Sequence, residues 1–195
     1  MLYFKTVSYL IRSWTFLILY SRKWRAWKQS LFILFLTALM GCGRYQDISS
    51  RPSPLEADTL QAGDLTLSIT YSSPRVRARK IWDGVVPFEK IWRTGANEAT
   101  VFETNRDLII ENKSLPKGKY SIFSIPTNEN WIIIFNKEWD QWGAYGYNER
   151  KDQLRITIKP SNNLSHQEEM TFKVDTSTIQ FRWENLGYNL SYALY

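Results

Sequence analysis

The side chains best suited to chemistry lie in one polar turn, residues 93–98 (RTGANE), between two apolar segments. In the structural interpretation, which we favour, Asn97 or Glu98 satisfies buried amides, and Arg93 or Arg79 compensates the carboxylate. In the functional interpretation, the polar groups of this turn bind a ligand. The candidate ligand-binding residues of the turn are Arg93, Thr94, Asn97 and Glu98.

Six aromatic residues fall in or beside predicted loops rather than at strand centres: Trp82, Trp92, Trp139, Trp142, Tyr145 and Tyr147. Flat aromatic faces beside arginine, asparagine and acidic groups suit a small polar ligand such as a sugar or glycan fragment. The candidate platform residues for such a ligand are Trp92, Trp139 and Trp142. Aromatic residues at the base of loops more often plug a core, so both interpretations stay open.

A pair of carboxylates offers a catalytic alternative. Glu98 with Asp83 or Asp140 could act as acid and base in glycoside hydrolysis, although the sequence does not give their separation. The only histidine, His166, lies in a polar loop, and a serine or cysteine hydrolase would depend on it alone. We therefore expect a non-catalytic binding or scaffolding domain, with a glycan-directed envelope hydrolase as the alternative.

Metal and cofactor chemistry finds little support in the composition. A zinc site needs several Cys or His ligands, and the chain offers only Cys42 and His166. An oxygen-only calcium site would have to use loop acids, without the spacing of an EF-hand. The candidates for it are Asp140, Glu149 and Asp152. Glycine-rich phosphate loops and dinucleotide fingerprints are absent from the sequence, so we expect neither a metal nor a cofactor.

The elements that position these residues are predicted to be strands. In residues 64–71 (DLTLSITY), apolar and polar side chains alternate, which is typical of a half-buried strand. Similar runs recur at 99–104, 107–112, 119–125, 131–136, 153–159, 169–174, 178–183 and 188–194. Turn signals at 113–118 and 184–187 separate some of them, and residues 131–135 lack alternation, as in a central strand. About nine strands without helical periodicity predict an all-β fold, either an antiparallel sandwich or a jelly-roll-like barrel.

The first 42 residues are typical of a bacterial lipoprotein leader. A basic segment, residues 22–28, precedes ten apolar residues, 31–40, and then Gly41 and Cys42. This apolar core suits a helical signal peptide better than a membrane span of about 20 residues. Residues 39–42 (LMGC) resemble a lipobox, whose cysteine receives the lipid. A translation start placed too early would explain the long N-terminus, and a helical hairpin or an uncleaved anchor is the competing interpretation.

Charge and composition divide the chain into a leader (1–41), a flexible tether (42–63) and a β domain (64–195). Six of the 25 basic residues and none of the 19 acids precede Cys42, so the rest of the chain is neutral. That balance argues against nucleic-acid binding. We expect the protein on the extracytoplasmic side of the envelope, bound to the membrane through lipid on Cys42, and on the outer membrane in a Gram-negative cell.

Residues 71–100 read YSSPRVRARKIWDGVVPFEKIWRTGANEAT, followed by LPKGKYSIFSIP, WIIIFNKEWDQWGAYGY and QLRITIKP. Together these stretches resemble the DUF2911 family of bacterial secreted or lipid-anchored proteins, over roughly residues 64–184. The chain has Ala78 and Glu89 where the family commonly has glycine, so we expect the local backbone to differ there. The resemblance implies a β domain outside the cytoplasm and no particular activity.

Overall fold

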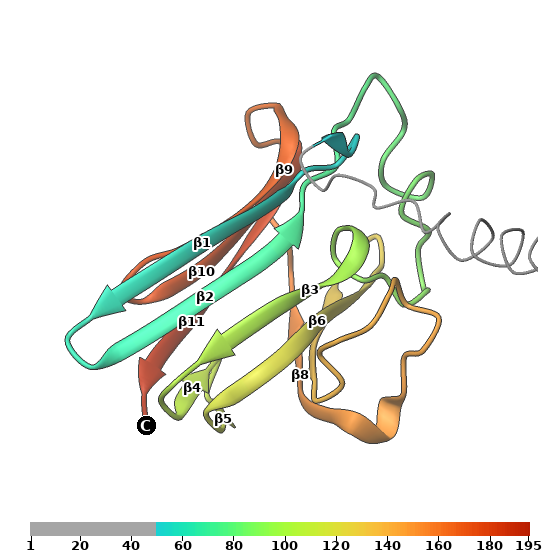
Figure 1. The fold of residues 1–195 in the computed structure, drawn as a ribbon. Helices are drawn as coiled ribbons and strands as arrows, with labels where there is room; N and C mark the ends of the chain where they lie inside the picture. Colours follow the sequence, from blue (N-terminus) through green and yellow to red (C-terminus); the bar gives the residue numbers. More distant parts are fainter. Residues whose placement is uncertain (1–49) are drawn as a thin grey trace, which may run out of the picture. The chain divides into compact units, whose positions relative to one another are not determined.

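The computed structural model describes residues 50–195, and the predicted leader and Cys42 lie outside the described residues. Two antiparallel sheets make up this part of the chain (Figure 1). One has the order β1-β2-β3-β6-β7-β8, with the bounds Leu55–Ala62, Leu65–Ser72, Ala96–Thr104, Gly118–Pro126, Trp131–Asn136 and Asp152–Ile158. The other has the order β5-β4-β11-β10-β9, with the bounds Lys113–Leu115, Leu108–Ile110, Leu186–Leu194, Thr178–Glu184 and Gln167–Val174. Within residues 50–195, no helix is long and apolar enough to cross a membrane.

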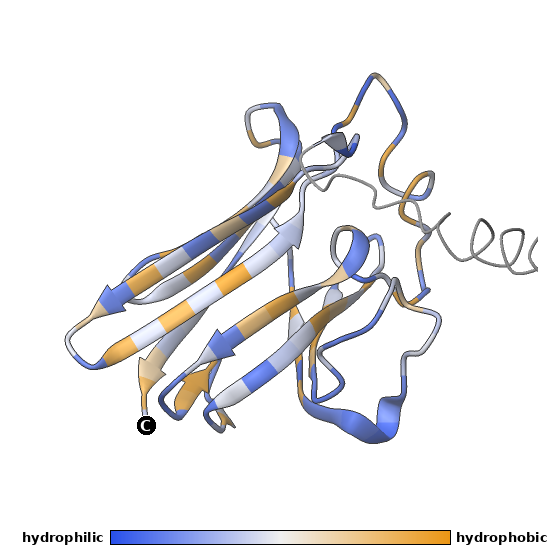
Figure 2. Ribbon diagram, in the orientation of Figure 1, coloured by the Kyte–Doolittle hydropathy of each residue, from blue (hydrophilic) through white to orange (hydrophobic). Residues whose placement is uncertain are grey.

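The prediction of an antiparallel sandwich is confirmed, and the barrel alternative is wrong, because the two sheets do not close into a barrel within the described residues. Apolar and more polar residues alternate along β2 (Figure 2), and the apolar ones are buried in the core. Leu65, Leu67 and Ile69 are buried there. Side-chain bonds link the sheet edges: Asp58 of β1 accepts from the Val174 backbone N–H of β9 at 2.6 Å.

Two strands were not expected. Leu55–Ala62 pairs along its whole length with β2, whereas we expected a flexible tether over residues 42–63. Only its Leu60 packs against the core, so its sequence lacks the apolar alternation of an ordinary strand. Lys113–Leu115 forms β5 inside the segment predicted to be only a turn.

A 23-residue connection, loop 73–95, crosses one end of the sandwich between β2 and β3 (green in Figure 1). Ala78 and Glu89 in this loop have φ of 53° and 60°, the left-handed conformation that glycine favours. The family commonly has glycine at these two positions. The backbone of this chain therefore keeps a conformation there that glycine would readily adopt. This differs from our expectation of a changed backbone.

Four tryptophans fill the core beneath this loop. The ring centroids of Trp82 and Trp131 are 4.9 Å apart, and Trp92 stacks on Trp183 at 6.0 Å. Trp82 and Trp92 come from the loop, whereas Trp131 and Trp183 come from one sheet each. These side chains therefore fasten the loop to both sheets and give it a fixed inner surface.

Residues 137–151 fold back over the outer face of the six-stranded sheet. Ala144 and Tyr147 pack there against a small buried cluster of Ala99, Phe123 and Ile134. This cover explains why β7 is buried on both faces, as predicted for residues 131–135. The same segment brings its residues 142–145 close to the start of β3, where the Gly143 N–H donates to the Asn97 carbonyl at 3.1 Å.

Candidate functional site

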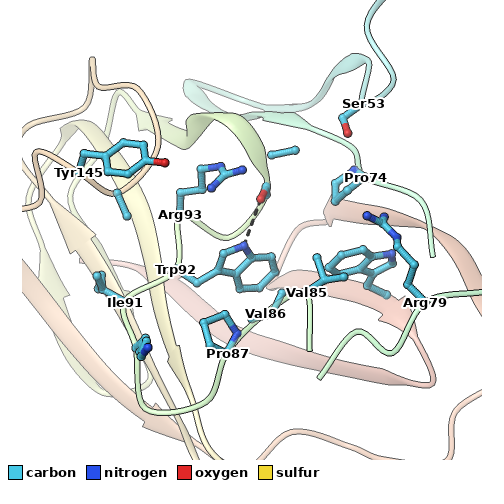
Figure 3. Close-up of a pocket in the computed structure, with 15 residues that line it drawn as sticks. Ser53, Pro74, Arg79, Val85, Val86, Pro87, Ile91, Trp92, Arg93 and Tyr145 are labelled. Carbon is cyan, nitrogen blue, oxygen red and sulfur yellow. Dashed lines mark hydrogen bonds between the residues drawn. The ribbon is translucent and has the colours of Figure 1, made fainter. Parts of the chain in front are cut away.

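A pocket of about 660 Å³ opens at the end of the sandwich covered by loop 73–95. Its walls come from that loop, from Ala96 of β3 and Trp183 of β10, and from Ser53, Ala144 and Tyr145. Figure 3 shows Tyr145 on one side of the opening and Arg79 on the other, with Trp92 and Arg93 between them. A pocket of this size is large enough for a small organic molecule.

The charged residues that line the pocket are all cations: Arg79, Lys90 and Arg93. Arg93 is half-buried, and its Nε is buried without a hydrogen-bond partner. Within residues 50–195, its guanidinium forms no ion pair. Burial lowers the pKa of Arg93, yet an arginine stays protonated at neutral pH. A cation that is partly removed from water and faces a pocket without acids is a candidate binding site for an anion.

Arg79 is oriented by backbone rather than by an acid. Its Nε donates to the Val76 carbonyl at 3.1 Å, and its guanidinium also donates to the Arg75 carbonyl. Neutral carbonyls fix the side chain without cancelling its charge. Lys90 is exposed at the rim, and its ammonium has no ion pair in the described part of the chain. Both side chains therefore add to the positive potential of the pocket.

The apolar lining of the pocket includes three aromatic side chains beside its aliphatic ones. The Trp92 indole N–H donates to the Gly95 carbonyl at 3.1 Å, which fixes the ring beneath Arg93 (Figure 3). Trp183 lines the same pocket, and its indole nitrogen is a second buried donor without a partner. Tyr145 stands almost fully exposed at the rim. The pocket thus combines unbonded donors with flat apolar surface.

Asn97 and Glu98 serve a different purpose, which is to hold residues 51–54, named here the strap. Glu98 accepts a 2.5 Å ion-pair bond from Arg51, and the Asn97 side chain donates to the Ser53 carbonyl at 3.2 Å. The Ser73 N–H donates to the Pro54 carbonyl at 2.8 Å. The strap therefore lies along the pocket and supplies Ser53 to its wall.

The carboxylate of Glu98 is held in its ionised form. Burial alone would raise the pKa of Glu98, but hydrogen bonds from Arg51, from its own backbone N–H and from the Ser72 hydroxyl outweigh burial and lower the pKa. A carboxylate in this state is poorly suited to be a general acid. Glu98 and Asp140 line one small cleft of about 200 Å³, whereas Asp83 lines neither pocket and lies 3.6 Å from Lys80.

The remaining predicted residues lie in the core, in the pocket lining and at the surface. Thr94 is fully buried, with its hydroxyl 2.8 Å from that of Ser124, so it supports the turn from below. Trp92 and Arg93 line the pocket. Trp139 and Trp142 lie outside it and are exposed, with Lys119 over the Trp139 ring at 4.1 Å.

Most of the lining residues, including Lys90 and Trp183, were not among the predicted site residues. Trp183 lies on a strand with alternating apolar and polar residues, and its position is typical of a core residue. No local sequence pattern therefore indicates that it lines a pocket. The cluster of basic residues around Arg79 and the Lys90-to-Arg93 spacing were the available hints. The possible calcium ligands gain no support: within residues 50–195, no group of three or more His, Cys, Asp or Glu side chains is arranged to hold a metal ion.

The fold and the pocket define an all-β sandwich with a cation-lined pocket at one end. Residues 53–191 match the model of the DUF2911 family, described as a protein of unknown function. The chain belongs to this family, as the sequence resemblance indicated. Comparisons with curated proteins and with solved structures gave no match.

Proposed function

We propose that this domain is a lipid-anchored, non-catalytic binding module of the cell envelope and that its ligand is a small anion held in the sandwich-end pocket. The observation that carries the proposal is Arg93, a half-buried cation without an acidic partner in a pocket that has no carboxylate in its lining. Leaving such a charge unpaired costs stability, and a bound anion would offset that cost.

The aromatic walls indicate the rest of the ligand. Trp92, Trp183 and Tyr145 offer flat apolar surface beside the cations. A carboxylate or phosphate attached to a ring or another apolar body would use both kinds of surface. The glycan suggested by the sequence fits this pocket best if it carries an acidic group, because a neutral sugar would leave Arg93 unpaired.

The anchor and the location rest on the sequence. The basic segment, apolar core and Cys42 favour export and lipid attachment, with the domain on the extracytoplasmic side and, in a Gram-negative cell, on the outer membrane. Mass spectrometry of the purified protein tests this part of the proposal. We expect an acylated Cys42 at the N-terminus, and an intact Met1 with a free thiol would reject the anchor.

Calorimetric titration tests the pocket. The panel pairs small carboxylates and phosphates, including acidic sugars, with their neutral analogues. We expect heat from an anion but not from its neutral analogue. Arg93→Gln should weaken that binding roughly 10- to 100-fold, since a charge-assisted hydrogen bond contributes about 1.5 to 3 kcal/mol. Arg150→Gln, an exposed arginine outside the pocket, is the matched control. Equal heat from an anion and its neutral analogue in the wild type, or unchanged anion binding by Arg93→Gln, would contradict the proposal.

Glycan hydrolysis remains the second candidate, because Glu98 and Asp140 line one cleft together with the exposed Trp139. A lowered pKa suits Glu98 to the role of base or nucleophile, and Asp140 would then have to be the acid. Incubation with cell-wall and plant glycans tests this candidate. Turnover that Glu98→Gln abolishes while the fold is retained would support hydrolysis over binding.

A further inference from the structure

Seven large hydrophobic side chains are exposed among residues 50–195: Leu55, Val85, Trp139, Trp142, Tyr145, Leu194 and Tyr195. Most of them lie close to the strap and are not scattered over the surface. Val85 and Tyr145 line the same pocket as Ser53 of the strap. Leu55 follows the strap directly in the chain and shares a cleft with Trp139. These exposed side chains therefore mark the end of the sandwich at which the described chain begins.

Trp142 joins the same group through the strap itself. The Arg51 guanidinium lies 6.0 Å from the centroid of the Trp142 ring, which is 58% exposed. The other two exposed residues, Leu194 and Tyr195, end the chain at the opposite end of the sandwich (Figure 1). We call the end that carries the strap, Val85, Trp142 and Tyr145 the strap end.

The side chains of the strap end are those that favour a membrane interface. Trp and Tyr combine an apolar ring with a polar group and are enriched where hydrocarbon meets water. Loop 73–95 carries six basic and two acidic residues. Glu168 and Glu169 of β9 contact this loop, Glu169 through an ion pair with Arg75, which leaves an excess of two positive charges. Exposed aromatic rings with nearby cations are drawn to anionic phospholipid.

Covalent geometry limits how far this end can be from the bilayer. Eight residues lie between Cys42 and Arg51, so nine residue-to-residue steps join them. A chain of that length reaches at most about 30 Å, at about 3.3 to 3.6 Å per residue. If Cys42 carries the lipid, the strap end is the part of the domain with the shortest covalent link to the membrane. A second contact would then be intramolecular, so that even a weak attraction is effective.

We propose that the strap end docks on the phospholipid surface, with Trp142, Tyr145 and Val85 in the headgroup layer. The docking rests on the proposed anchor at Cys42 and goes beyond it, since an anchor alone would let the domain stand away from the bilayer. Docking also places the opening of the cation-lined pocket, whose rim includes Tyr145 and Val85, at the membrane surface. The ligand would then reach the pocket from the headgroup layer.

Quenching by nitroxide-labelled lipid tests the docking. Val85→Cys and, as the matched control at the opposite end, Tyr195→Cys are each labelled with bimane on the lipidated full chain, in which acylation blocks Cys42. The proteins are reconstituted into phosphatidylethanolamine and phosphatidylglycerol vesicles that contain the quencher. We expect several-fold stronger quenching at position 85 than at position 195. Adding Trp142→Ser should lower the quenching at position 85 toward the value at position 195.

The outcomes separate the docking from the anchor. Protein that sediments with the vesicles but is quenched equally at positions 85 and 195 retains the anchor and overturns the docking. Strong quenching at position 85 that Trp142→Ser leaves unchanged overturns the role of the exposed aromatic residues. Protein that does not sediment at all overturns the anchor and the docking together.

Discussion

Arg93 and Glu98 lie five residues apart in one turn, yet the structure uses their charges in opposite ways. Glu98 is held by Arg51 and the Ser72 hydroxyl, so its charge is balanced within the fold. Arg93 faces a pocket, and its Nε remains without a partner. The comparison shows that two residues close together in one polar motif need not belong to the same binding site. A charge that is satisfied internally stabilises the fold, whereas an unsatisfied charge in a pocket is available to a ligand.

The largest effect on stability is expected at Asn97. Like Glu98, it forms hydrogen bonds within the fold. Asn97→Ala removes hydrogen bonds to Ser53 and Ser72 and places alanine at a φ of 53°. The free energy of unfolding should fall by about 2 to 3 kcal/mol in denaturant titration. Asn97→Gly, which accepts this φ, should recover about 1 kcal/mol of the loss. Equal losses in the two variants would contradict this account.

A smaller loss is expected when the balanced charge is removed. Glu98→Gln should lower the free energy of unfolding by about 1 kcal/mol, because Arg51 loses its ion pair but the amide can still accept a hydrogen bond. In a double-mutant cycle with Arg51→Met, the two residues should show a coupling of about 0.5 to 1 kcal/mol. Glu103→Gln, whose partner Lys119 is 3.6 Å away at the surface, is the control and should show almost no effect.

The same contribution should depend on pH with a defined sign. Because the pKa of Glu98 is lowered in the folded state, its stabilisation is fully present above the unfolded-state pKa and is lost as pH falls through the folded-state pKa. The difference in stability between the wild type and Glu98→Gln should be constant near pH 7 and shrink below about pH 4.5. A difference that grows on acidification would show that the carboxylate is not stabilised as described.

The smallest effect, with the opposite sign, is expected at Arg93. Arg93→Met keeps much of the apolar stem and removes an unbalanced, half-buried charge. Stability should stay unchanged or rise by up to about 1 kcal/mol in the ligand-free protein. Arg150→Met, an exposed arginine, provides the baseline. A loss of stability larger than that of Glu98→Gln would mean that Arg93 has an internal structural role. The contrast between Arg93 and Glu98 would then not hold.

Strands were predicted well from the sequence where one face is buried and the other is exposed to solvent. The segments around Leu67 and Phe181 alternate in sequence and form β2 and β10 as expected. Leu55–Ala62 escaped prediction because an edge strand with most of both faces in water needs no apolar alternation. Lys113–Leu115 escaped because three residues inside a segment rich in turn signals carry too little pattern.

The candidate site could be predicted only in part. Arg93 and Trp92 were found because polar and aromatic residues clustered locally in the chain. Trp183 was missed because about 90 residues separate it from Arg93 and only the packing of the two sheets brings them to one pocket. The partner of Glu98 was also out of reach, since Arg51 lay in a segment expected to be a flexible tether. Contacts of this kind, between residues far apart in the sequence, leave no local sequence pattern.

The polar character that hid β1 also affects how neighbouring molecules meet. An edge strand exposes N–H and C=O groups to which a second chain could add a strand. In β1, Glu56 and Asp58 put negative charge along that edge, and Asp58 also occupies the Val174 N–H of the facing edge strand β9. If many copies share one bilayer, collisions between their edges are frequent. Repulsion between these acidic rims would keep such a crowded layer from growing into aggregates.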